Sequence, residues 1–118
     1  MFRPGMSARD QLEALETALG FAWDDQDWGI VNADPARTSE FICFFESNYD
    51  GSWSPWTVAE FVDLVMESAS QAVRADLQLP VGCIDRFVVV AAPIAPQQFA
   101  YWTSNDWAIT PHLRALGL

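Results

Sequence analysis

The stretch that decides the fold is residues 54–76, SPWTVAEFVDLVMESASQAVRAD. Its apolar side chains recur every three or four residues, which is the spacing of an α-helix that buries one broad face. Ser54 is a helix N-cap and Pro55 stands at the first helical position, while Thr57 with Glu60 offers an alternative capping box. The stretch therefore predicts one long amphipathic helix that begins at Pro55 and runs to about its last residue.

The residues before this stretch predict two more helices. The first covers about 8–19, where Ser7 provides the N-cap and Gly20 stands where a left-handed C-terminal cap belongs. The second covers about 35–47, because Asp34 precedes a proline and apolar residues then recur at helical spacing. Both helices carry an apolar face, so we expect them to pack against the long helix.

The last third of the chain allows two interpretations. The β-branched residues 88–90 would suit a buried strand, yet the apolar residues around them also fall at helical spacing. Short helices opened by proline are predicted at 97–102 and 112–116. The first interpretation is a mainly α fold, a compact helical bundle that forms a single globular domain over residues 1–118. The alternative is an α+β fold with a small sheet formed from about 84–103.

Composition indicates one acidic domain. The chain has 118 residues, 51% of them hydrophobic, which is enough material for one core. Its formal net charge of −10 argues against direct nucleic-acid binding and against docking on a membrane, and it favours a basic protein partner. The chain contains no lysine, which removes Schiff-base chemistry. No apolar run is long enough for export or membrane insertion, so we expect a cytoplasmic protein.

No motif in the sequence supports catalysis or metal binding. Cys43, Cys83 and His112 lack the paired spacing of zinc ligands, and the aspartates that follow Trp23 lack the spacing of a calcium loop. Acid–base catalysis needs carboxylates in desolvated surroundings, whereas most carboxylates here are expected on solvated helix faces or in loops such as the packed loop predicted over 21–33. We therefore expect no enzyme activity, no cofactor and no metal.

Six tryptophans in so short a chain suggest a binding surface, because tryptophan is enriched at interface hot spots. Two segments combine tryptophans with aspartates, and we predict that they meet at one end of the fold as aromatic anchors inside a rim of carboxylates. On this hypothesis Trp53→Ala weakens partner binding and costs less stability than the core truncation Phe61→Ala. The predicted partner-binding residues are Asp24, Asp25, Asp27, Trp28, Asp50, Trp53 and Trp56.

In size, charge and aromatic content the chain resembles the small acidic immunity proteins that block cationic bacterial toxins, and phage-encoded inhibitors that mimic nucleic-acid charge. The resemblance is one of class and involves no residue motif. It implies a non-enzymatic protein that neutralises a basic partner, either a toxin or a nucleic-acid-binding protein. The alternative is a small enzyme or ligand-binding domain that uses tryptophans and carboxylates on a sugar or a cationic metabolite. A deep pocket with inward carboxylates would favour that alternative.

Overall fold

The computed structural model describes residues 1–22 and 27–118. Within these two ranges the chain forms α-helices joined by turns and loops and contains no β-strand, so the prediction of a mainly α fold is confirmed and the α+β alternative is not supported. A short 3₁₀ turn, η1 (Pro35–Arg37), leads into the third helix. The α-helices are α1 (Ala8–Leu19), α2 (Trp28–Val31), α3 (Thr38–Asn48), α4 (Pro55–Arg74), α5 (Cys83–Ala91), α6 (Pro96–Thr103) and α7 (Thr110–Ala115).

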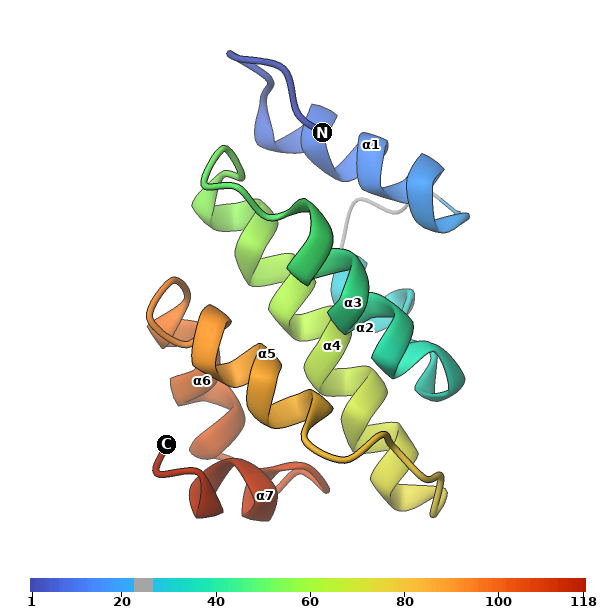
Figure 1. Ribbon diagram of the computed structural model, residues 1–118, viewed down its shortest axis with the longest axis vertical. Helices are drawn as coiled ribbons and strands as arrows, with labels where there is room; N and C mark the ends of the chain where they lie inside the picture. The colour runs from blue at the N-terminus through green and yellow to red at the C-terminus, as the bar shows by residue number, and fades with distance from the viewer. Residues whose placement is uncertain (23–26) are drawn as a thin grey trace.

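The long helix α4 is the centre of the fold. It crosses the middle of the molecule, with α3 on the viewer's side and α2 behind it in Figure 1. The helices α1, α2, α3 and α6 all pack against it. More than half of its side chains are buried, which is too many for a helix covered on one side only. These buried residues are Thr57, Val58, Phe61, Val62, Leu64, Val65, Met66, Ser68, Ala69, Ser70 and Ala72.

Capping residues set the ends of the two helices that the sequence predicts best. The hydroxyl oxygen of Ser7 accepts the backbone N–H of Asp10 at 3.1 Å, and Gly20 ends α1 with a left-handed φ of 75°. The hydroxyl oxygen of Ser54 accepts the backbone N–H of Thr57 at 3.0 Å and so begins α4. The helix predicted over 8–19 is confirmed with the same bounds.

Two predicted segments differ from the structure in detail. The described part of 21–33 is not only a loop, because one helical turn, α2, forms within it. The helix predicted from residue 35 begins as η1 and becomes α-helical only at Thr38. The carboxylate of Asp34 caps η1 by accepting the N–H of Ala36 at 3.0 Å. Such tight 3₁₀ turns are frequent at the N-termini of α-helices.

The ambiguous segment near the C-terminus forms α5 and α6. On α5 the buried side chains include Phe87, Val88 and Ala91, whereas Val89 and Val90 are exposed. A half-buried strand would bury alternate residues, so this burial pattern is that of a helix. The β-branched residues that suggested a strand are therefore divided between the core and the solvent, and the packing of the helix decides their conformation.

A buried glutamine fixes the start of α4 against α1. The side-chain oxygen of Gln11 accepts the backbone N–H of Ser54 and the hydroxyl of Thr57, both at 2.8 Å. Its amide nitrogen donates to the carbonyl oxygen of Ser52 at 3.0 Å. Because a buried amide without partners would be costly, this set of three bonds holds α1 and the α3–α4 connection in one arrangement.

The contact between α2 and α4 is so close that only glycine fits. A β-carbon added at Gly29 would overlap the carbonyl oxygen of Glu60 and would lie 2.7 Å from the amide nitrogen of Leu64. Both obstructing atoms belong to the backbone of α4, so neither can move aside by a change of rotamer. Gly29 thus sets the distance between the two helices.

We predict that Gly29→Ala lowers the free energy of unfolding by about 3 kcal/mol, the upper part of the usual range for overpacking. Urea unfolding measures this loss. Gly20→Ala is the control, because nothing lies within 4 Å of its added β-carbon and only its left-handed φ opposes alanine, at a cost of roughly 1 kcal/mol. Equal losses in the two variants would contradict the close contact between α2 and α4.

Candidate functional site

Two of the predicted anchor tryptophans lie in the core. Trp28 is 1% exposed, and its indole N–H donates to Oε1 of the buried Glu16 at 3.1 Å. Trp53 is 5% exposed. Its ring lies 5.3 to 5.8 Å, centroid to centroid, from the rings of Phe2, Phe45, Tyr49 and Phe61. Neither side chain is therefore available on the surface of this fold as an anchor for a partner.

The other predicted residues are not brought together at one end. Asp50 is exposed and bonds Ser52 in the turn before α4, and Trp56 is 48% exposed at the start of that helix. Asp27 is exposed at the start of α2, beside Asp63 near the middle of α4. The helix rises about 13 Å from Ser54, near Asp50, to Asp63, near Asp27. Asp50 and Asp27 therefore do not form one site. Asp24 and Asp25 lie outside the described residues.

A row of polar residues on α4 joins two of the predicted residues. One face of the helix carries residues spaced at intervals of four, three and four positions, which are Trp56, Glu60, Asp63 and Glu67. Asp27 acts electrostatically on both Glu60 and Asp63. We call Asp27, Glu60, Asp63 and Glu67 the acidic stripe. It contains one predicted site residue, and Trp56 adjoins it.

Glu60 is held at the contact between α2 and α4. It does not form the alternative capping box, because the backbone N–H of Thr57 donates to Ser54. Instead Oε2 of Glu60 accepts the backbone N–H of Gly29 at 3.0 Å. Its side chain is half-buried, and the loss of hydration raises the pKa of the carboxyl, with further upward contributions from Asp63 and Asp27. The bond from Gly29 opposes this rise in pKa only in part.

Asp63 is also fixed by hydrogen bonds, but its donors come from α6 and not from α2. Its Oδ1 accepts the indole N–H of Trp102 and the side-chain N–H of Gln98, each at 3.0 Å, and both donors belong to α6. Burial raises the pKa of Asp63 in spite of these bonds, and the charges of Asp27 and Glu67 raise it further. In the described chain, no arginine forms an ion pair with Asp27, Glu60 or Asp63.

A pocket of about 320 Å³ opens beside Asp63, between α2, α4 and α6. Its lining residues are Asp27, Ile30, Asp63, Gln98 and Tyr101, and we call it the aspartate pocket. Tyr101 is 49% exposed and Ile30 38% exposed, so the pocket combines two carboxylates with an aromatic and an aliphatic wall. This combination suits a cation that carries an apolar stem.

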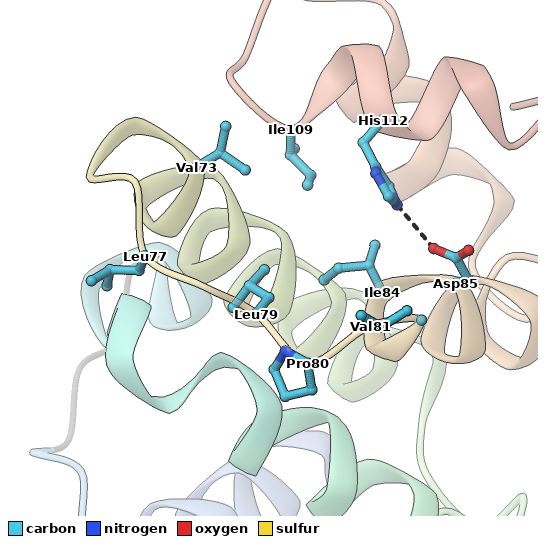
Figure 2. A pocket seen from close by; sticks show the side chains of 10 residues that line it. Val73, Leu77, Leu79, Pro80, Val81, Ile84, Asp85, Ile109 and His112 are labelled. Atoms are coloured by element: carbon cyan, nitrogen blue, oxygen red, sulfur yellow. Dashed lines mark hydrogen bonds and ion pairs between the residues drawn. The ribbon is translucent and has the colours of Figure 1, made fainter.

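A second concavity, of about 410 Å³, lies between the end of α4, the start of α5 and α7, as Figure 2 shows. Aliphatic side chains line most of it, among them Leu79 and Ile84. At its rim, Nε2 of His112 and Oδ1 of Asp85 share a hydrogen bond of 2.9 Å (Figure 2). Asp85, the carboxylate among the described lining residues, has a partner of opposite charge when the imidazole is protonated. None of the predicted site residues that the structure describes lines this groove.

The sequence contained a signal for the acidic stripe. Glu60, Asp63 and Glu67 are the acidic residues of α4, and their spacing alone places them together. Gln98 and Tyr101 had no such signal, because they reach the site only through the packing of α6 on α4. Among the described residues, no three histidine, cysteine or carboxylate side chains are placed to hold a metal ion together.

Comparison of the chain with protein-family models, with curated proteins and with solved structures gives no match. None of the helices in the two described ranges has the length and apolar character needed to cross a membrane.

We predict that Trp53→Ala destabilises the fold by about 3 to 5 kcal/mol, as much as Phe61→Ala, because both side chains are core residues in mutual contact. This expectation replaces the smaller loss that the sequence suggested for Trp53. Thermal and urea unfolding of the two variants measure the losses. Trp56→Ala is the control, since its exposed side chain should cost no more than about 0.5 kcal/mol. A loss for Trp53→Ala no larger than that of the control would refute its core role.

We predict that Glu60 and Asp63 make stability fall as pH rises. The pKa values of Glu60 and Asp63 are raised in the folded protein, so the folded state binds these protons more tightly than the unfolded chain, whose values lie at about 4. Their contribution is therefore favourable at low pH and is lost as pH rises through the raised folded values. Urea unfolding of the parent and of Asp63→Asn is measured at pH values from about 4 upward. The difference between their free energies of unfolding at each pH gives the contribution of Asp63.

In Asp63→Asn the decline of stability with rising pH should be smaller, because asparagine does not titrate but can still accept both N–H donors through its oxygen. The matched control is Asp76→Asn, which removes one exposed charge away from the stripe, where the positive φ of 56° suits asparagine. If both variants show the same pH dependence as the parent, the carboxyl of Asp63 does not carry the effect.

Proposed function

We propose that the chain is a non-enzymatic binding protein whose acidic stripe neutralises a basic protein partner, as an immunity protein or an inhibitor does. The observation that carries the proposal is the arrangement of Glu60 and Asp63. Both carboxylates are half-buried, the charge of Asp63 raises the pKa of Glu60, the charge of Asp27 raises the pKa of both, and no arginine of the described chain forms an ion pair with either. A cation supplied by a partner would relieve this repulsion.

The shape of the stripe favours a protein partner over a small metabolite. Together with the adjoining Trp56, it extends about 16 Å along α4, to Glu67. Exposed apolar side chains such as Val31 and Tyr101 lie on the helices beside it. Carboxylates flanked by apolar contact area are what a basic protein surface requires, because the charges guide its approach and the apolar atoms supply burial. Trp56 keeps its predicted role as an exposed aromatic anchor at one end of the stripe.

We predict that the association rate with the native partner falls as salt rises, because exposed charges are screened over about 8 Å at physiological ionic strength. The partner is first purified and identified, and its binding is then followed by stopped-flow fluorescence from low to high salt. The double variant Glu60→Gln/Asp63→Asn should associate more slowly than the parent at low salt and show a weaker salt dependence. An association rate that does not change with salt would refute the proposed function.

A further inference from the structure

We infer that the aspartate pocket receives the guanidinium group of an arginine side chain of the partner. This inference rests on the proposed function. It names the pocket at which the partner is bound and the chemical group of the partner that enters it. It depends on the way the pocket is built, from two carboxylates, an amide, an aromatic ring and an aliphatic side chain that belong to α4, to α6 and to α2 with its N-cap residue Asp27.

The carboxylate of Asp63 is oriented before any partner arrives. Its Oδ1 is fixed by two N–H donors from α6, at 3.0 Å each, whereas no residue of the described chain donates to its Oδ2. Because the amide nitrogen of Gln98 donates to Asp63, the amide oxygen of Gln98 is left as a further acceptor at the pocket. A ligand that enters therefore meets acceptors held in place, which reduces the entropy lost on binding.

The number and chemistry of these acceptors favour guanidinium. Asp27, Asp63 and Gln98 present several oxygen acceptors around one pocket, and a guanidinium carries five N–H donors in one plane. The exposed ring of Tyr101 provides an aromatic face for that plane, and Ile30 provides a surface for the methylene stem. An ammonium group has three donors around a single strongly hydrated charge, so it would use fewer of these features.

The protein contains the same combination of contacts around one of its own arginines. The guanidinium of Arg37 donates to both carboxylate oxygens of Glu40, at 2.9 and 2.6 Å. It also lies 5.3 Å from the centroid of the Phe21 ring and 5.0 Å from that of Phe41. The aspartate pocket offers carboxylates and an aromatic ring in a similar way, but among the described residues no arginine lines it.

The test uses the full chain labelled with ¹⁵N and two short peptides that differ in one residue, acetyl-Gly-Arg-Gly-amide and acetyl-Gly-Lys-Gly-amide. Two signals report on the pocket directly, the indole N–H of Trp102 and the side-chain N–H of Gln98, because both groups bond to Asp63. The arginine peptide should move both signals in a saturable way, and the lysine peptide should bind about fivefold more weakly.

Asp63→Asn should remove the response to the arginine peptide, and Asp76→Asn should keep it although it changes the net charge equally. The unliganded spectrum shows whether each variant is folded. Equal binding of the two peptides, no saturable shift, or an equal loss in both variants would overturn the assignment. If the association rate with the native partner still depends on salt while Asp63→Asn leaves it unchanged, the pocket assignment fails and the proposed function stands. An association rate that does not depend on salt would refute both the pocket assignment and the proposed function.

Discussion

The burial of α4 on several sides is the constraint on which the rest of the structure depends. Four helices pack against it, and its apolar residues occupy most of its circumference. The charged side chains of α4 are therefore confined to one narrow row, the face that carries Glu60 and Asp63. Because α2 and α6 cover the two edges of that row, its carboxylates are partly removed from water although they belong to the helix's most polar face. The position of the acids is thus a consequence of core packing.

This arrangement has a cost that the fold offsets locally. Partly buried carboxylates that repel one another oppose folding at neutral pH. The N–H groups of Gly29, Gln98 and Trp102 compensate for part of the lost hydration. The same bonds hold α2 and α6 against α4, so they stabilise the fold and orient the carboxylates at once. A surface on which acids served solubility alone would leave them fully hydrated, without such fixed partners.

The parts of the fold set by local interactions could be predicted from the sequence. The bounds of α1 follow from Ser7 and Gly20, and α4 begins where Ser54 caps it. Residues 83–91 could not be assigned, because a short apolar run fits a helix or a strand until its neighbours are known. Trp53 was misplaced for a related reason. It stands in a polar turn, yet its ring packs against Phe2, far away in the chain, and against Phe61 on α4.

The arginines of the described chain leave most of the acidic stripe without an ion pair. Among the described residues, five arginines lie within 4.0 Å of a carboxylate. One of these described pairs involves the acidic stripe, where Arg74 lies at 4.0 Å from Glu67. The others bond acids elsewhere, so Asp27, Glu60 and Asp63 have no arginine partner in the described chain. Exposed acids such as Asp10 and Asp76 form no ion pair there either, but Glu60 and Asp63 differ from them in being partly buried and fixed by N–H donors. An acidic surface becomes selective for a partner when its carboxylates are both unpaired and fixed, because mobile hydrated acids bind any cation weakly. The remaining pairs are Arg9–Glu13, Arg37–Glu40, Arg86–Glu46 and Arg114–Asp106.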